Sequence, residues 1–270
     1  DGQYQQAIAD TSKAIELEPK NARYWDSRSA AYHADGQYQQ AIADTSKAIE
    51  LEPENAEYYL SRGVSYHADG QYQQAIADTS KAIELKPENA EYYLSRGVSY
   101  HADGQYQQAI ADTSKAIELK PENAEYYLSR GVSYHADGQY QQAIADKSKA
   151  IELEPENDWF IFQYALTFLK QGNYEQFHIL LDKAKELTIE RLRCDPRDWV
   201  AYFNNALYQV ASGSYSEAKQ SYFTGVRESL SVHKINVAIR SLQLWVDETD
   251  EQEAKDLLAQ VKLALNERTS

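Results

Sequence analysis

Residues 56–89 read AEYYLSRGVSYHADGQYQQAIADTSKAIELKPEN, and residues 90–123 repeat that stretch letter for letter. Residues 124–157 differ from it at two positions, and residues 22–55 differ mainly in their first ten. The string DGQYQQAIAD begins at Asp1 and returns at Asp35, Asp69, Asp103 and Asp137, so the period is 34 residues. Repeats of this length indicate a stacked array of one supersecondary unit rather than a chain folded around a single core.

Each repeat predicts two helices. Tyr59, Gly63 and Tyr66 are spaced i, i+4, i+7, which places them on one helical face, and the spacing continues through the second half of the repeat. Asp69-Gly70 signals a turn between the two helices. Asn89 is placed to cap the first helix of the next repeat. Because such a short pair cannot bury its own apolar stripe, we expect it to stack on its neighbours.

These features resemble the tetratricopeptide repeat (TPR), a 34-residue helical pair with the pattern W-x2-L-G-x2-Y, then A-x3-F, then P. This chain has Tyr59-x2-Arg62-Gly63-x2-Tyr66, then Ala75-x3-Thr79, then Pro87. Threonine replaces the second aromatic residue of the pattern in the regular repeats. The resemblance is clear over residues 1–157. It implies an all-α, right-handed superhelical solenoid of antiparallel helix pairs, in which the first repeat is incomplete.

From Asp158 onward the sequence changes, and the repeat continues in a weaker form. Pro196 comes seven residues later than the period predicts, which we interpret as a lengthening of the helix near residues 177–193 by about two turns. Residues 232–245 and 250–266 predict two further amphipathic helices. We interpret them as a terminal cap; the alternative is a docking surface or a connection to another domain. The predicted regions are therefore a regular array over 1–157 and a degenerate TPR-like helical region with a C-terminal cap over 158–270.

The composition excludes several classes of protein. The 42 acidic and 27 basic residues give a net charge of −15, which argues against nucleic acid and against an anionic membrane surface as partners. No apolar run approaches the ~18 residues of a transmembrane helix, and no signal-peptide pattern is present. The single cysteine, Cys194, cannot form an intrachain disulfide, so we expect a reducing, cytoplasmic location. The absence of methionine indicates a fragment or a processed form.

The sequence contains no glycine-rich phosphate loop, H-E-x-x-H pair, C-x-x-C motif or G-x-S-x-G elbow. We therefore expect no enzymatic activity, no catalytic residues and no cofactor. His33, His67, His101 and His135 recur at the period and form a ladder, whereas a metal ion needs converging nitrogen ligands. We predict no metal site and interpret these histidines as polar residues on a groove face, with a weak pH response as a minor alternative.

In the TPR family the first helix of each pair lines the concave surface. The resemblance implies a partner-binding groove at Glu57, Leu60, Val64, His67, Asn89, Glu91, Leu94, Val98, His101, Asn123, Glu125, Leu128, Val132 and His135. Leucine and valine form an apolar track flanked by glutamate and histidine; the alternative is burial of the leucines between repeats. TPR co-chaperones hold a terminal carboxylate with lysine and asparagine, but this face carries glutamate. We therefore predict a basic or amphipathic helix or strand as the partner.

In the second region, the residues at the repeat positions that correspond to the predicted groove are almost wholly apolar. They include Trp159, Phe162, Leu166 and Phe203. These residues form either an apolar pocket for a partner or a surface that the C-terminal helices fold back to fill. The second interpretation is favoured, because large bare apolar patches are rare on soluble monomers.

Together these features predict a non-enzymatic protein–protein interaction scaffold that binds a peptide or protein partner in its concave groove. Near-identical repeats favour a long or repetitive partner and binding through avidity. One alternative is self-assembly into homo-oligomers by stacking of the array ends. Another is the sensor arm of a larger bacterial signalling ATPase or caspase-like protease, because proteins resembling those often carry TPR arrays.

Overall fold

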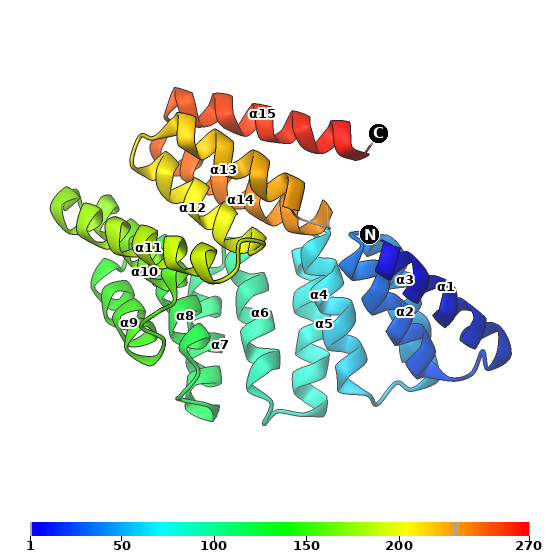
Figure 1. Ribbon diagram of the computed structural model, residues 1–270. Helices are drawn as coiled ribbons and strands as arrows, with labels where there is room; N and C mark the ends of the chain where they lie inside the picture. The colour runs from blue at the N-terminus through cyan, green and yellow to red at the C-terminus, as the bar shows by residue number, and fades with distance from the viewer. Residues whose placement is uncertain (1, 229–231, 270) are drawn as a thin grey trace. The chain divides into compact units, whose positions relative to one another are not determined.

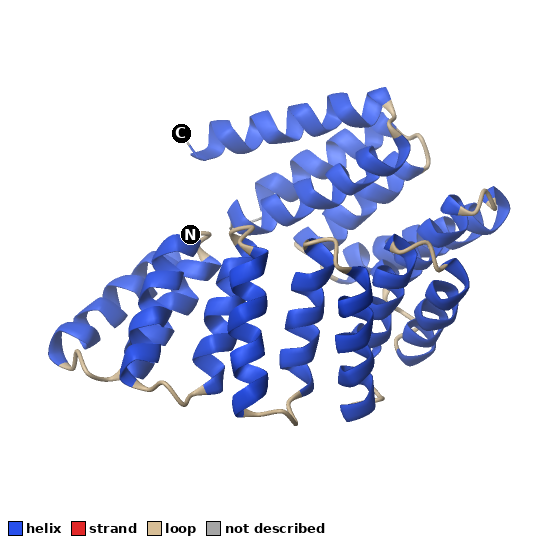
Figure 2. Ribbon diagram, turned by 180° about the vertical axis from the view of Figure 1, so that it is seen from behind, coloured by secondary structure: helices blue, strands red, loops and turns tan. Residues whose placement is uncertain are grey.

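The computed structural model describes residues 2–228 and 232–269, and within those ranges the chain is α-helical between short turns (Figures 1 and 2). This confirms the predicted all-α fold. No helix in the described ranges is both long and apolar enough to cross a membrane. The helices are α1 (Gly2–Leu17), α2 (Ala22–Ala34), α3 (Tyr38–Leu51), α4 (Ala56–Ala68), α5 (Tyr72–Leu85), α6 (Ala90–Ala102), α7 (Tyr106–Leu119), α8 (Ala124–Ala136), α9 (Tyr140–Leu153), α10 (Asp158–Lys170), α11 (Tyr174–Cys194), α12 (Trp199–Ala211), α13 (Tyr215–Glu228), α14 (Val232–Thr249) and α15 (Gln252–Thr269).

The chain divides into two compact units. Unit 1 is Asp1–Leu153 and unit 2 is Glu154–Ser270. The loop between α9 and α10 separates them, and the boundary predicted after residue 157 lies at the other end of that loop.

Unit 1 is built from alternating helices of two kinds. We call α2, α4, α6 and α8 the A helices and α3, α5, α7 and α9 the B helices; α1 has the sequence of a B helix. Each A helix packs on the B helix that follows it and on the B helix before it, so that the helices stand side by side (Figure 1). Successive A helices also contact one another, and they do so more extensively than successive B helices. The A helices therefore line the concave side of unit 1, which we call the A-helix face.

Local sequence determines where these helices begin and turn. The Asn55 side chain accepts a hydrogen bond from the backbone N–H of Glu57 at 3.1 Å, as expected of an N-cap residue. Gly70 has φ +80°, a left-handed conformation that costs glycine little and other residues more. Both features recur in the other regular repeats. The predicted caps and turns are confirmed.

Small residues bring the helices of a pair close together. Ala75 and Ala82 of α5 are fully buried. A Cβ added to Gly63 of α4 would lie 3.0 Å from Cγ2 of Thr79, so a larger residue fits here only if the threonine side chain shifts by a few tenths of an ångström. The glycine in the first helix and the threonine in the second therefore form one packing unit.

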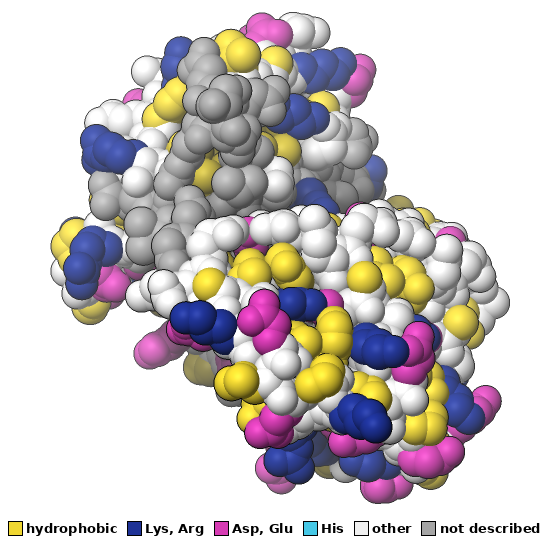
Figure 3. Space-filling view, turned by 90° about the vertical axis from the view of Figure 1, so that its right-hand side faces the viewer, with side chains coloured by type: hydrophobic (Ala, Val, Ile, Leu, Met, Phe, Trp, Pro, Cys, Tyr) yellow, Lys and Arg dark blue, Asp and Glu magenta, His cyan; other side chains and the backbone are white. Residues whose placement is uncertain are grey.

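Helix α1 has a partly uncovered face. Ala7 and Ala14 of α1 are half-exposed, whereas Ala41 and Ala48, which occupy the same repeat positions in α3, are fully buried. Leu17 is 83% exposed. The side of the molecule where α1 lies shows hydrophobic side chains between charged ones (Figure 3).

Unit 2 continues the pairing with α10–α11, α12–α13 and α14–α15. Helix α11 has 21 residues, whereas the B helices of unit 1 have 14, so the predicted lengthening by about two turns is confirmed. The two helices predicted at the C-terminal end correspond to α14 and α15.

Candidate functional site

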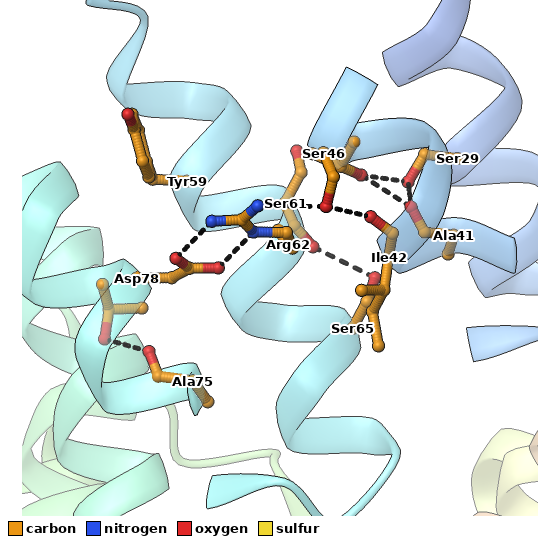
Figure 4. Close-up of polar contacts among 12 residues, drawn as sticks. Ser29, Ala41, Ile42, Ser46, Tyr59, Ser61, Arg62, Ser65, Ala75 and Asp78 are labelled. Atoms are coloured by element: carbon orange, nitrogen blue, oxygen red, sulfur yellow. Dashed lines mark hydrogen bonds and ion pairs between the residues drawn. The ribbon is translucent and has the colours of Figure 1, made fainter. Parts of the chain in front are cut away.

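An arginine clamp holds the A helices in place. The Arg62 guanidinium donates from Nε to Oδ2 of Asp78 at 2.6 Å and from Nη2 to Oδ1 at 2.8 Å, and Nη1 donates to Oγ of Ser46 at 3.0 Å (Figure 4). These hydrogen bonds to the Asp78 carboxylate raise the pKa of Arg62. The rings of Tyr59 and Tyr66 lie 6.0 and 5.8 Å from the guanidinium carbon. One side chain thus joins α4, α5 and α3.

The same clamp recurs in four repeats, at Arg28–Asp44, Arg62–Asp78, Arg96–Asp112 and Arg130–Asp146. The sequence analysis missed it. An arginine and an aspartate recurring sixteen residues apart in each repeat were the signal that could have revealed it.

Two cavities open between successive A helices. One of about 250 Å³ lies between α2 and α4, and one of about 220 Å³ lies between α4 and α6. The positions that line the first cavity recur 34 residues later in the second, where Gly63 replaces Ser29 and Val64 replaces Ala30, so a similar cavity is repeated at the interval of a repeat. The first is lined by Ser29, Ala30, His33, Leu60, Ser61, Val64 and Ser65, and the second by Gly63, Val64, His67, Thr79, Glu91, Leu94, Ser95, Val98 and Ser99. The lining of the second recurs unchanged in sequence between Gly97 and Ser133.

The valines and the leucines of the predicted track differ in exposure. Val64 and Val98 are 40% and 38% exposed, and Val132 is half-buried. Leu60 is half-buried, whereas Leu94 and Leu128 are only 6% and 8% exposed. The expectation of an exposed leucine track needs correction, because Leu94 packs against Ala90, Ala116 and Tyr126 in the core. Of these apolar side chains, Val64 and Val98 are the exposed ones.

The histidines form the predicted ladder and connect neighbouring A helices. Nδ1 of His33 lies 3.2 Å from Oγ of Ser65, Nδ1 of His67 lies 3.3 Å from Oγ of Ser99, and Nδ1 of His101 lies 3.2 Å from Oγ of Ser133. Burial lowers the pKa of His101, and the charges of Lys147 and His67 lower it further. The rings of His135 and Tyr140 meet edge to face, with their centroids 5.5 Å apart. Among the described residues, no group of three or more histidines, cysteines or acidic residues could hold a metal ion.

Acidic side chains stand beside the cavities. Glu57, Glu91 and Glu125 are exposed in the first turns of α4, α6 and α8. Glu57 accepts a hydrogen bond from the Tyr92 hydroxyl; burial and this bond raise the pKa of Tyr92 to about 12. Lys86 reaches Glu57 only at 3.9 Å.

Asp26 occupies in α2 the repeat position of Leu60. Burial raises its pKa, the nearby charge of Glu57 adds to this, and a bond from Ser61 opposes it. Its Oδ1 is buried and has no hydrogen-bond partner within the described part of the chain. In α2 the exposed Arg23 occupies the repeat position of Glu57, so the row of first-turn glutamates begins at α4.

The two predicted groove asparagines serve as helix caps. Asn89 accepts a hydrogen bond from the backbone N–H of Glu91 at 3.0 Å, and Asn123 accepts one from Glu125 at 2.9 Å. A role for them in binding a partner stays a prediction.

The apolar residues predicted as a pocket in unit 2 are largely packed. Phe162 and Phe203 are 2% and 5% exposed, whereas Trp159 and Leu166 are half-buried. The ring of Trp245 from α14 lies 6.4 Å from that of Phe162. The ring of Phe203 lies 6.1 Å from that of Tyr222 in α13. At these two phenylalanines the structure agrees with the favoured interpretation, in which later helices cover the surface, and not with the alternative of an open pocket.

A buried polar network joins three helices of unit 2. The Asp158 carboxylate, 1% exposed, accepts hydrogen bonds from Nη1 of Arg191 at 2.5 Å, Nδ2 of Asn204 at 2.8 Å and the Tyr208 hydroxyl at 2.8 Å. Burial and the nearby carboxylate raise the pKa of Tyr208. Because the carboxylate is fully paired, this network holds α10, α11 and α12 together.

Comparisons with known proteins agree with this architecture. A family model for the TPR repeat matches residues 30–70, 63–104 and 99–138, and a second, for the tetratricopeptide repeat, matches residues 134–188. Comparison with curated proteins returned no match.

Solved structures share the fold. A tetratricopeptide repeat protein from Parabacteroides merdae is 16% identical, with a TM-score of 0.66, over 89% of this chain and 92% of that one. YrrB, described as a TPR protein with an unusual peptide-binding site, is 22% identical, with a TM-score of 0.51, over 71% and 95%. MamA from Desulfovibrio magneticus is 20% identical, with a TM-score of 0.56, over 62% and 94%. At these identities the likeness establishes the fold alone. Since the family models together cover residues 30–188, the chain belongs to the tetratricopeptide repeat family.

Proposed function

We propose that this chain is a non-enzymatic scaffold that binds a peptide or protein partner on the A-helix face of unit 1. TPR repeat proteins are generally protein–protein interaction modules. The observation that carries the proposal is a similar cavity repeated at the interval of a repeat, with an exposed valine at each step. The peptide-binding site in the description of YrrB lends support by analogy.

The face suits recognition by burial of apolar side chains. A partner that covers Val64 and Val98 removes apolar surface from water, and Leu94 behind them provides a packed wall. Because the same contacts recur along the array, several weak contacts combine into one stronger association.

The test is selection of binding peptides from a random library displayed on phage. The variant carries Val64→Lys, Val98→Lys and Val132→Lys. The matched control carries Ala43→Lys, Ala77→Lys and Ala111→Lys, which add the same charge at exposed positions of the B helices. We expect selected peptides to bind the native chain and the control but not the valine variant. Equal binding to all three folded proteins would refute the proposal.

Self-assembly through the array end is a second candidate, because α1 presents half-exposed alanines that are buried in the equivalent B helix. Light scattering across a wide concentration range tests it. A mass that rises with concentration, and that Ala7→Glu with Ala14→Glu abolishes, would support end-to-end association. A constant monomer mass would exclude it. The proposal of a sensor arm for a bacterial ATPase or protease stays a prediction.

A further inference from the structure

We infer that the partner on the A-helix face is an extended, basic peptide with an apolar side chain at every third residue. This inference rests on the proposed function and specifies the occupant of the same face.

The spacing of the cavities matches every third residue of a peptide in the polyproline II conformation. The cavities of α2–α4 and α4–α6 share Val64 and are displaced by one A helix. Helices in contact lie about 8–10 Å apart. A peptide in the polyproline II conformation has three residues per turn and rises about 3.1 Å per residue, so every third side chain returns to the same side after about 9 Å. In a β-strand the side chains of one face lie about 6.6 or 13 Å apart, which fits the cavities less well.

Each cavity is large enough for one apolar side chain. The volumes of about 220 and 250 Å³ exceed the roughly 150 Å³ of an apolar cavity known to hold benzene. Each cavity therefore has room for one leucine, isoleucine or valine side chain. Val64, Leu94 and Val98 form apolar walls for it.

Serine hydroxyls in the cavities favour an extended peptide over a helix. An α-helix places residues i and i+7 about 10.5 Å apart, so a helical partner also matches the spacing. The cavities, however, contain serine hydroxyls beside their apolar walls, at Ser61 in the first and Ser95 in the second. An extended peptide exposes backbone N–H and C=O groups that can bond to these hydroxyls, whereas a helix bonds its own.

The negative charge of the A-helix face favours a basic peptide. Each repeat from α4 to α8 presents one exposed glutamate in the first turn of its A helix, and Glu91 itself lines the second cavity. Lysine or arginine between the apolar residues of the peptide would face this row of carboxylates.

Fluorescein-labelled synthetic peptides test the inference by anisotropy titration. The first peptide has four copies of Leu-Lys-Pro; the second has the same composition in scrambled order. A third has glutamate for each lysine, and a fourth is an amphipathic helix with leucine at every seventh residue. We expect the first peptide to bind at least about tenfold tighter than each of the others, a difference of about 1.4 kcal/mol.

Variants connect binding to this face. Val64→Lys with Val98→Lys and Val132→Lys should abolish binding of the first peptide, and the B-helix lysine control should retain it. Glu57→Gln with Glu91→Gln and Glu125→Gln should weaken binding by at least about fivefold, because three attractive charges are lost.

Two results would overturn the inference. One is equal or tighter binding of the scrambled or helical peptide; the other is no binding of the first peptide. Either result leaves the proposed function intact if library-selected peptides still bind the native chain and not the valine variant. If those peptides also fail to discriminate, the proposed function itself is wrong.

Discussion

In the arginine clamp, two oppositely charged side chains are largely buried and depend on each other for hydrogen bonds. The Arg96 side chain is 20% exposed and that of Asp112 is 10% exposed, and they share two short hydrogen bonds. Arg96→Ala leaves the Asp112 carboxylate buried without its partner. We expect the free energy of unfolding in urea to fall by about 3 kcal/mol.

Two controls separate the clamp from ordinary surface charge. Lys115→Ala removes an exposed pair with Glu118, at 2.9 Å, and should leave stability unchanged. Arg96→Ala combined with Asp112→Ala should cost less than the two single changes added together. If Arg96→Ala behaves like Lys115→Ala, the clamp does not stabilise the array.

Lys147 breaks the repeat pattern at a buried position. Threonine occupies its place at Thr79 and Thr113, but Lys147 is 1% exposed, and its Cγ lies 2.8 Å from where a Cβ on Gly131 would be. Lys147→Thr replaces this long side chain by the threonine that packs against the A-helix glycine in the other repeats. We expect a gain in unfolding free energy of about 1 kcal/mol, because the close packing at Gly131 is relieved.

The same change has a spectroscopic signature. The Lys147 charge helps to lower the pKa of His101, so the pKa of His101 should rise in Lys147→Thr when its imidazole resonances are followed by NMR. Burial, the larger cause, persists, so the pKa should not rise to that of an exposed histidine. An unchanged pKa would mean that the two groups do not interact in solution.

At the scale of a helix, the stability of each A helix depends on the asparagine that caps its N-terminus. Asn89 accepts a hydrogen bond from the N–H of Glu91 at 3.0 Å. Asn89→Ala should cost about 1 kcal/mol of unfolding free energy, whereas Asn89→Ser keeps an acceptor and should cost much less. If Asn89 acts only as a cap, peptide binding to Asn89→Ser should equal that of the native chain. Weaker binding would place this asparagine in contact with the partner.

Helix positions were predictable from sequence because they depend on local signals. The Asp-Gly turns, the asparagine caps and the apolar spacing all recur within one repeat, and the helices begin and end accordingly. The two-turn extension of α11 was predictable because Pro196 is displaced from the period. These features need no knowledge of distant contacts.

The surface of the A helices was less predictable because exposure depends on the neighbouring element. Leu94 and Val98 are four residues apart on α6, but only Leu94 meets α7 and α8 in the core. Phe162 lies at a groove offset in sequence, yet Trp245 of α14 packs on it from more than eighty residues away. A single-sequence pattern cannot say which apolar side chain another helix will cover.

For the molecule as a whole, the near-identity of the repeats makes unit 1 a linear array of equivalent interfaces. The stability of such an array is approximately a sum over repeats and over the contacts between neighbours. The arginine clamp is one such contact between neighbouring repeats, because Arg62 and Arg96 each donate a hydrogen bond at 3.0 Å to a serine of the preceding B helix.

Deletion of residues 90–123 tests this equivalence. Because that stretch repeats 56–89 letter for letter, Asn89 would be followed by Ala124, and each remaining interface would keep its own residues. Arg130, for example, would meet Ser80 in place of Ser114. We expect a folded chain with lower unfolding free energy, the remaining helices being intact by circular dichroism.

The deletion also links the array to its ligand. The lining occurs three times, in the two cavities described and again in sequence between Gly97 and Ser133, and the deletion removes one of the three. The affinity for four copies of Leu-Lys-Pro should therefore fall by about fivefold or more, since one buried leucine contributes about 1.5–3 kcal/mol at most. The affinity for two copies should not change, because two adjacent cavities remain. If the 34-residue deletion weakened both peptides equally, the cavities would not act as equivalent subsites, and binding would depend on one particular repeat.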